Sequence, residues 1–333
     1  MRITTLDLAD ADEVGAAYAV LVASRSVDRP TFVAPGQADL VADWRHEDPG
    51  EEQVLRVARL DGRVVGMCSA WYPLGDNLDK VWADVNVDPP IRRRGVGTAL
   101  VHDLLAQARS RGRSRVVVEA ACPVTGPADH PCGPFAQRQG FRMGVTETTR
   151  RLVLPVPAAR LAELGEHARQ RYAGRYAVAT YDEVPEHLVG PLCRLGNLVG
   201  SQAPSGEIEW ETESMTPQRY QGLRALDREQ GRVRLTALAT EVATGEAVAY
   251  SELMLRPGLT RVEQWGTLVD EAHRGHRLGL AVKVANLQTL QDRFPDRRDV
   301  TTSNAVENPW MIAINEDLGF RPVELLVGYV RDR

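Results

Sequence analysis

The sequence predicts a mixed α/β fold, built as two consecutive domains with the same order of strands and helices. A length of 333 residues is enough for two separate cores. Strand patterns and amphipathic helix patterns alternate in the same order in both halves. The arginine- and glycine-bearing turn in PIRRRGVGTALVH (90–102) returns in EAHRGHRLGLAVK (271–283), each time before an apolar helix. Gly279 follows Gly97 by 182 residues, and Gly319 follows Gly140 by 179, which indicates a duplication.

The first half, residues 1–154, is expected to combine a β-hairpin with a strand–helix–strand unit. Two β-rich runs flank Asp61-Gly62, a dipeptide that favours a tight hairpin turn. A further strand leads directly into the first arginine–glycine turn. The expected elements are strands at 2–6, 80–87, 114–121 and 147–156, a hairpin at 53–72, and helices at 11–24, 38–44, 97–111 and ending before 140.

Residues 155–174 are expected to form a helix that connects the two domains, with Pro155 and Pro157 at its start and Gly174 after it. The second half, residues 175–333, repeats the order of the first. Its mostly antiparallel sheet should again be flanked by helices. The expected elements are strands at 176–181, 232–255 (a pair turning at 244–245), 261–269, 299–304 and 324–331, and helices at 186–199, 217–230, 279–294 and ending before 319.

Composition is that of an ordinary globular protein, which we expect to be cytoplasmic and either a monomer or a homodimer, and any phosphate that it binds should be small. The net charge is −5 and the arginines are dispersed, so a nucleic-acid backbone is a poor candidate partner. No apolar run reaches the length of a membrane span, and no membrane partner is predicted. The spacing of Cys122, His130 and Cys132 matches no standard zinc pattern, so no metal is predicted.

The two turns have the character of small-anion sites. Where a helix directly follows a strand, the first N–H groups of the helix have no backbone partners. The helix dipole adds partial positive charge at this end. Glycines let a diphosphate approach the backbone, and arginines add charge-assisted hydrogen bonds. A plain helix cap with solvated arginines is the alternative reading of either turn alone.

Two other phosphate-binding motifs are excluded. The chain lacks the Gly-x-x-x-x-Gly-Lys-Ser/Thr pattern of P-loop NTPases. In GVGTAL, Leu100 occupies the place of the third glycine of the dinucleotide fingerprint. Both turns also follow a hairpin instead of opening a domain, which argues against a dinucleotide-binding enzyme.

The residues of the turns resemble the signature of the GNAT superfamily of acyl-CoA-dependent N-acetyltransferases, Arg/Gln-x-x-Gly-x-Gly/Ala. The first turn matches it fully with Arg92, Gly95 and Gly97, whereas Arg277 takes the first glycine position of the second turn. The resemblance covers both halves and implies two tandem GNAT-fold domains with acetyl-CoA as cofactor. Duplicated GNAT chains of this length include mycothiol synthase, but the residues do not single out that enzyme.

The same resemblance assigns residues to the cofactor. In this family the valine that ends the strand, five residues before the arginine, hydrogen-bonds the pantetheine arm through its backbone. The assigned residues are Val87, Arg92, Arg93, Arg94, Gly95, Val96, Gly97 and Thr98 in the first half, and Val269, Arg274, Gly275, His276, Arg277, Leu278, Gly279, Leu280, Asn304 and Asn308 in the second.

Three residues of the second half are the predicted catalytic group. A second family element aligns with NPWMIAINEDLGF, where Asn315 replaces the tyrosine that often protonates the departing thiolate. In the first half the columns corresponding to Asn308 and Asn315 hold Asp129 and Ala136. Histone-type members place a general-base Glu where this chain has Glu263, and Tyr250 is a candidate acid on the preceding strand.

We therefore expect the C-terminal domain to be catalytic. The reverse assignment stays open, because Arg277 could obstruct the second turn. The predicted reaction is transfer of an acetyl group to the primary amine of a small molecule, by direct attack on the thioester. A non-catalytic acyl-CoA-binding protein and a protein-lysine acetyltransferase are the alternatives. Acidic and aromatic residues that would suit a cationic acceptor are Glu209, Trp210, Glu211 and Trp310.

Overall fold

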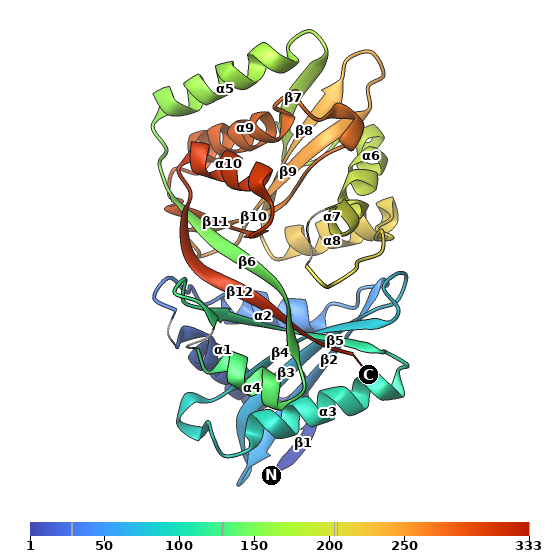
Figure 1. The fold of residues 1–333 in the computed structure, drawn as a ribbon, viewed down its shortest axis with the longest axis vertical. Helices are drawn as coiled ribbons and strands as arrows, with labels where there is room; N and C mark the ends of the chain where they lie inside the picture. Colours follow the sequence, from blue (N-terminus) through green and yellow to red (C-terminus); the bar gives the residue numbers. More distant parts are fainter. Residues whose placement is uncertain (28, 128–129, 203, 205, 333) are drawn as a thin grey trace. The chain divides into compact units, whose positions relative to one another are not determined.

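The computed structural model describes residues 1–27, 29–127, 130–202, 204 and 206–332. These residues form two compact units, each a sheet flanked by helices (Figure 1). Unit 1 comprises Met1–Thr148, Ser205–Glu209 and Val323–Arg333, and unit 2 comprises Thr149–Pro204 and Trp210–Pro322. The predicted mixed α/β fold is thus confirmed, with mostly antiparallel sheets.

The helices and strands follow the expected order. From the N-terminus to the end of the first half they are β1 (Arg2–Thr5), α1 (Ala11–Ser26), α2 (Gln37–Arg45), β2 (Glu51–Leu60), β3 (Arg63–Pro73), β4 (Lys80–Val87), η1 (Pro89–Ile91), α3 (Val96–Ser110), β5 (Arg115–Cys122), α4 (Cys132–Arg138) and β6 (Arg142–Val153). The rest are α5 (Ala158–Tyr172), β7 (Tyr176–Tyr181), α6 (Glu186–Asn197), α7 (Val199–Gln202), α8 (Pro217–Glu229), β8 (Val233–Glu241), β9 (Ala247–Leu255), β10 (Arg261–Val269), η3 (Glu271–His273), α9 (Leu278–Arg293), β11 (Asp299–Ala305), α10 (Pro309–Leu318) and β12 (Arg321–Asp332).

In unit 1 the strands lie in the order β1-β2-β3-β4-β5-β12, with residues 142–148 of β6 beside β12. The pairing of β4 with β5 is parallel, whereas β1–β2, β2–β3, β3–β4 and β5–β12 are antiparallel. Asp61 and Gly62 both have positive φ, as the predicted hairpin turn between β2 and β3 requires. One sheet face packs on α3 through Leu100 and Leu104, and the other packs on α1.

In unit 2 the order is β7-β8-β9-β10-β11, and residues 149–153 of β6 follow β11. Here β10 and β11 are the parallel pair. Helix α9 packs on one sheet face and is buried along nearly its whole length, while α6 and α8 cover the other face. Helix α5 was expected to connect the domains, but its Leu161, Leu164 and Ala168 pack in the same core as α9.

The last strand of the chain completes the sheet of unit 1. Strand β12 pairs with β5 from Leu325↔Cys122 to Asp332↔Arg115. The expected division into 1–154, 155–174 and 175–333 follows the chain, whereas the units exchange the ends of two strands, β6 and β12. This exchange is non-local, so the pattern of each half alone does not reveal it.

In each unit the parallel strands separate just before the turn. The β4–β5 ladder runs from Lys80↔Arg115 to Ala83↔Val118, although β4 continues to Val87. The β10–β11 ladder stops at Glu263↔Thr301, although β10 continues to Val269. We call the gap beyond each ladder the splay of that unit. Backbone groups that line a splay are no longer bonded by the neighbouring strand.

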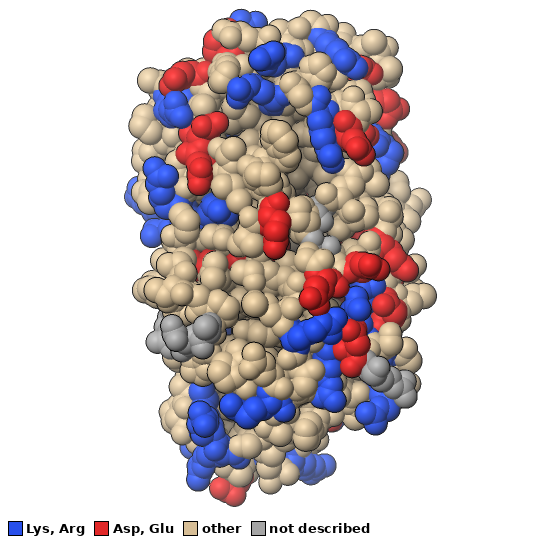
Figure 2. Space-filling view, viewed as in Figure 1, with Lys and Arg blue, Asp and Glu red and all other residues tan. Residues whose placement is uncertain are grey.

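The described helices include none that is long and apolar enough to cross a membrane. On the face drawn in Figure 2, basic and acidic side chains are interspersed, in keeping with the small net charge of −5.

Candidate active site

The turn between β4 and α3 has an unusual backbone. Arg93 and Gly95 both adopt left-handed conformations, with φ of 67° and 84°. Gly95 is the N-cap of α3, and among the described residues no side chain caps this helix. By contrast, Asp10 caps α1 and Thr216 caps α8 with side-chain oxygens. The first N–H groups of α3 are therefore available to an anion.

The turn of unit 2 repeats this geometry with the glycine in the other position. Gly275 has φ of 84° and Arg277, the N-cap of α9, has φ of 55°. The sequence left open whether Arg277 obstructs the turn, and its backbone takes the same left-handed form as Gly95. Beside the turn, the Tyr176 hydroxyl and His273 Nδ1 are hydrogen-bonded at 2.9 Å, and the His276 ring lies close to Tyr176.

The signature arginines of both turns fold back onto their own strands. Arg92 Nε donates to the carbonyl of Val87, and Arg274 Nε donates to the carbonyl of Val269, at 3.3 and 3.4 Å. Arg92 also donates to the backbone and hydroxyl oxygens of Ser24 on α1. These guanidinium groups hold the turn against the end of the strand, so anion binding falls mainly to the backbone.

The second signature glycine lies where a side chain would intrude. A Cβ at Gly97 would lie 3.2 Å from the Phe135 ring of α4 and 3.6 Å from Val87. A Cβ at Gly279 would meet Ile314 and Val269 at 3.2 and 3.5 Å. In both units this glycine keeps a narrow space open between strand end, turn and following helix.

A cavity of about 620 Å³ in unit 1 begins at this turn and passes through the splay. On one side it is lined by Gly97 and Phe135, next to α3 and α4. On the other side it is lined by Arg25 of α1 and by Trp71 and Trp82. It therefore reaches both faces of the sheet between β4 and β5. Its volume lies within the range of about 300–1,000 Å³ that is usual for small-molecule sites.

Two acidic side chains stand where β4 and β5 separate. Asp84 follows Ala83, the last residue of β4 that pairs with β5, and Glu119 follows Val118, the last residue of β5 that pairs with β4. Asp84 forms an ion pair with Arg25 and accepts a hydrogen bond from Asn86 Nδ2 at 2.8 Å. Both carboxyl groups line the cavity, at the point where it crosses the sheet.

Glu119 is held in a state suited to proton transfer. Burial raises its pKa to about 8, and the nearby carboxylates of Glu147 and Asp84 add to the rise. A hydrogen bond from the Trp82 indole and the charge of Arg25 lower the pKa in part. A carboxylate with a pKa near the working pH is a competent general base.

Unit 2 lacks both carboxyl groups at the matching places. In unit 1, Asp84 and Glu119 each lie three residues beyond the strand pair Val81↔Val116. The equivalent pair in unit 2 is Glu263↔Thr301, and the residues three positions beyond it are Gly266 and Asn304. Asn304 Oδ1 accepts a hydrogen bond of 2.6 Å from Asn315 Nδ2. Among the described residues, no acid replaces either one at these two positions.

Asn315 lies in the core of unit 2. It is 0% exposed, and its Oδ1 accepts a hydrogen bond of 2.9 Å from Lys283 Nζ. Both ends of the amide are thus bonded, because Nδ2 donates to Asn304. Burial lowers the pKa of Lys283 to about 7. The predicted contact between Asn315 and a thiolate has no support from this arrangement.

The other two predicted catalytic residues occupy different surroundings. Glu263 forms an ion pair of 3.4 Å with Arg256, and its side chain is 45% exposed. Tyr250 is buried against α6, and its hydroxyl lies where a Cβ of Gly266 would be. Burial raises the Tyr250 pKa far above its ordinary value, so this phenol stays protonated.

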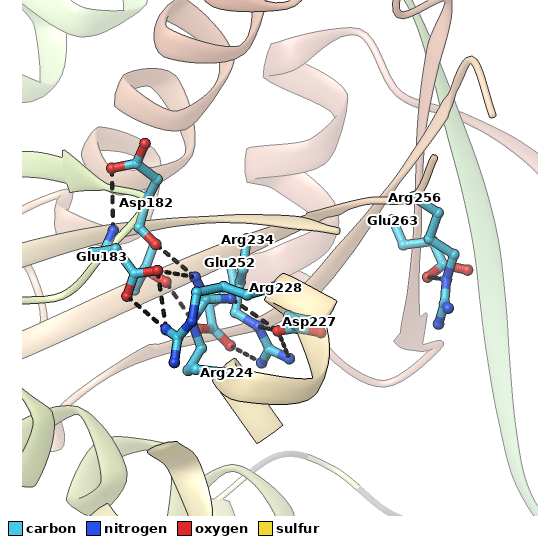
Figure 3. A network of polar contacts seen from close by, with 10 residues as sticks. Asp182, Glu183, Arg224, Asp227, Arg228, Arg234, Glu252, Arg256 and Glu263 are labelled. Carbon is cyan, nitrogen blue, oxygen red and sulfur yellow. Dashed lines mark hydrogen bonds and ion pairs between the residues drawn. The ribbon is translucent and has the colours of Figure 1, made fainter. Parts of the chain in front are cut away.

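The sheet face under α8 carries a buried ion network. Figure 3 shows this network and, separate from it, the Glu263–Arg256 pair. Asp227 binds Arg224 at 2.8 Å and Arg234 at 3.0 Å, and Arg234 also reaches Glu252 at 3.5 Å. Arg234 stacks over the Trp265 ring at 4.7 Å. The four buried members are two cations and two anions, and Arg224 also pairs with Glu183 at 3.8 Å. They lie on the face of unit 2 that corresponds to the α1 side of the unit 1 cavity.

The remaining predicted residues are dispersed. Asn308 caps α10 by accepting from the Met311 N–H at 3.1 Å, and the following Trp310 is 82% exposed. Glu209 belongs to unit 1, whereas Trp210 and Glu211 belong to unit 2. Asp129 lies outside the described residues.

Sequence reasoning missed the residues that line the cavity on the α1 side. Asp84 and Glu119 lie in two mostly apolar strands, WADVNV and VVVEAA, shortly before the turn and the α4 segment. An isolated acid in a buried strand is the signal that could have found them. Trp71 and Trp82, a cross-strand pair, were unassigned as well.

Comparison with known proteins agrees with this geometry. Residues 21–141 match the acetyltransferase (GNAT) family. A tandem GNAT protein from the clavulanic acid biosynthesis pathway superimposes with a TM-score of 0.77 at 25% identity, over 99% of this chain and 98% of that one. No curated protein sequence matches the chain.

Two more distant structures share the fold. A GCN5-related N-acetyltransferase from Sphaerobacter thermophilus has a TM-score of 0.65 at 16% identity, covering 99% of this chain and 95% of that chain. The glucosamine N-acetyltransferase region of a fungal multi-domain GH3 β-N-acetylglucosaminidase has a TM-score of 0.68 at 15% identity, over 98% of this chain and 38% of that chain.

A cavity that crosses a sheet at a splay, with an uncapped helix start at one end, defines an acetyltransferase domain of the GNAT family in residues 21–141. The chain as a whole has the fold of a tandem GNAT protein, with a second unit that repeats the order of strands and helices of the first.

Proposed function

We propose that unit 1 binds acetyl-CoA and transfers its acetyl group to the primary amine of a small molecule. The observation that carries this proposal is the cavity between β4 and β5, with Glu119 and Asp84 where the strands separate. The family match over residues 21–141 falls on this unit. The proposal reverses our expectation that the C-terminal domain is catalytic.

The residues present fit coenzyme A. The left-handed turn at Arg93 and Gly95 and the uncapped start of α3 suit a diphosphate. Gly97 keeps a narrow passage open beside Phe135. Beyond Ala83, the backbone groups of β4 that face the splay suit the amides of a pantetheine arm. When bound, the cofactor supplies a thioester whose carbonyl carbon is the electrophile.

Within the cavity, Glu119 accepts the proton that the amine loses as its C–N bond to the acetyl group forms; the C–S bond of the thioester breaks, and coenzyme A would leave as its thiolate. Its raised pKa matches this task, because the carboxyl is then a stronger base than an exposed glutamate. Trp82 holds the Glu119 carboxyl through its indole N–H. Arg25 forms an ion pair with Asp84 beside it. Once Glu119 has lost its proton, its negative charge favours entry of an ammonium ion.

Unit 2 retains the turn but has a different splay. Gly266 and Asn304 stand at the places of Asp84 and Glu119, and Asn304 is bonded to Asn315. Glu263, our earlier candidate, is neutralised by Arg256. We propose a binding or stabilising role for this unit, and the loss of carboxyl groups supports it.

The test compares matched variants of the full chain. Glu119→Gln should bind acetyl-CoA within about threefold of the wild type but release thiol at least about 100-fold more slowly. Glu263→Gln is the control and should retain its rate within about twofold. The opposite result would place catalysis in unit 2, and absence of acetyl-CoA binding by calorimetry would remove the proposal altogether.

A further inference from the structure

The side of the cavity next to α1 has an aromatic wall. Trp71 on β3 and Trp82 on β4 are directly opposed in the antiparallel ladder, so both rings lie on the same sheet face. Both line the cavity, together with the apolar side chains of Val27 and Leu326. The indole N–H of Trp82 is bonded to Glu119, and the ring faces and aliphatic side chains of this wall offer no hydrogen bonds to hydroxyl groups. Burying an unpartnered hydroxyl against these surfaces is unfavourable.

The ionised groups on this side are mostly compensated already. Asp84 pairs with Arg25, and Glu324 receives two hydrogen bonds of 2.8 Å from Arg29. Glu119 instead has a neutral partner, the indole of Trp82, with Glu147 nearby. Of the two carboxyl groups that line the cavity, Asp84 is thus paired and Glu119 is left to balance a bound cation, so a second cation would find the other carboxylate occupied.

From this wall and this charge balance we infer that the acceptor is a small monoamine with one flat, apolar ring. Its ring stacks against Trp71 and Trp82, and its single ammonium group approaches Glu119. Polyamines and aminoglycosides carry further cations, and amino sugars carry hydroxyl groups, which these walls do not satisfy. The inference rests on the proposed function and specifies its acceptor.

The first part of the test compares acceptors with the full chain at saturating acetyl-CoA. The probes are 2-phenylethylamine, spermidine and glucosamine. The turnover of each amine is measured by the release of the coenzyme A thiol. We expect kcat/KM for 2-phenylethylamine to exceed both others by at least about tenfold. An equal or better rate with spermidine or glucosamine would overturn the inference and leave the proposed function standing.

The second part uses variants of the wall. Trp71→Leu should raise KM for 2-phenylethylamine about five- to tenfold with kcat within about twofold, because ring stacking contributes to binding alone. Trp71→Phe keeps a ring and should stay within about threefold. Trp265→Leu, at a partly exposed tryptophan of unit 2, is the matched control and should leave both kcat and KM unchanged.

The outcomes separate the two claims. An unchanged KM in Trp71→Leu would overturn the inference, since the wall would then not contact the acceptor. Release with none of the three amines would also overturn it. Only if a calorimetric titration then shows no binding of acetyl-CoA does the proposed function fall with it.

Discussion

Gly95 and Arg277 occupy the same place in the two turns and share a left-handed backbone, although only one of them is glycine. For a residue with a Cβ this conformation costs about 1 kcal/mol or more. The turn of unit 2 has kept its shape despite that cost. Strain of this kind persists where the surrounding structure imposes the conformation.

The first prediction follows from this strain. Arg277→Gly should stabilise the protein by about 0.5–1 kcal/mol, because glycine adopts positive φ without a steric penalty. Gly95→Ala should destabilise it by a similar amount. Urea unfolding at one pH measures both, and a loss of stability in Arg277→Gly would mean that the arginine side chain contributes more than its backbone costs.

The second prediction concerns the pH dependence of turnover. If Glu119 is the base, kcat/KM rises with pH up to its pKa of about 8 and levels off above it. Glu147→Gln removes one of the charges that raise this pKa, so the rising part of the plot of kcat/KM against pH should move to lower pH. The acceptor ionises identically in the assays of the wild type and the variant, so it does not contribute to the difference. If kcat/KM rises over the same pH range in both proteins, Glu119 is not the group whose ionisation causes the rise.

Much of the fold was predictable because its signals are local. The dipeptide Asp61-Gly62 predicts a hairpin turn by itself. The arginine–glycine turn likewise predicts the start of a helix in both halves. Tandem architecture followed from the repeated order of such signals. The pairing of β12 with β5 was not predictable, because it joins strands some 200 residues apart through burial and hydrogen bonds that neither segment encodes alone.

The candidate site was predicted only in part for the same reason. The cofactor turn is one contiguous segment, whereas Glu119 and Asp84 meet through the register of parallel strands. Alignment with the family motif also placed Asn315 at the position of a catalytic tyrosine. Such an alignment does not reveal that Lys283 and Asn304 hold the Asn315 amide in the core. Burial decides between these readings, and one sequence carries little information on it.

The third prediction distinguishes the two turns as cofactor sites. Gly97→Val would fill the passage beside Phe135 and should weaken acetyl-CoA binding at least about tenfold. Gly279→Val makes the equivalent change in unit 2, against Ile314. Titration calorimetry measures both, with thermal melts to confirm folding. If only Gly279→Val weakens the binding, the cofactor site belongs to unit 2.

The fourth prediction tests the ion network of Figure 3. Asp227→Ala would remove the close carboxylate partner of buried Arg224, leaving Glu183 at 3.8 Å, and one of the two carboxylate partners of Arg234, and should cost about 3–5 kcal/mol of stability. Asp182→Ala removes a half-exposed pair with Arg293 and should cost at most about 1 kcal/mol. Similar small losses in both variants would show that the buried network is not a main support of unit 2.

The fifth prediction concerns Lys283, which is buried with a pKa of about 7, whereas in the unfolded chain it keeps its proton up to its ordinary value of 10.5. Between these values the unfolded state binds more protons, so raising the pH favours the folded state. The contribution of Lys283 to stability should increase by about 1 kcal/mol per pH unit above pH 7. Below pH 7, folding requires burial of the charged form.

Lys283→Met tests this directly. The variant loses the hydrogen bond to Asn315, a cost that does not depend on pH, so the informative quantity is the slope and not the absolute stability. We expect the stability of the wild type relative to the variant to rise between pH 7 and pH 9.5, measured by urea unfolding at several pH values. Other titrating groups are common to both proteins and cancel. Parallel curves would show that Lys283 stays protonated in the core, with Asn315 and the Phe320 ring as its partners.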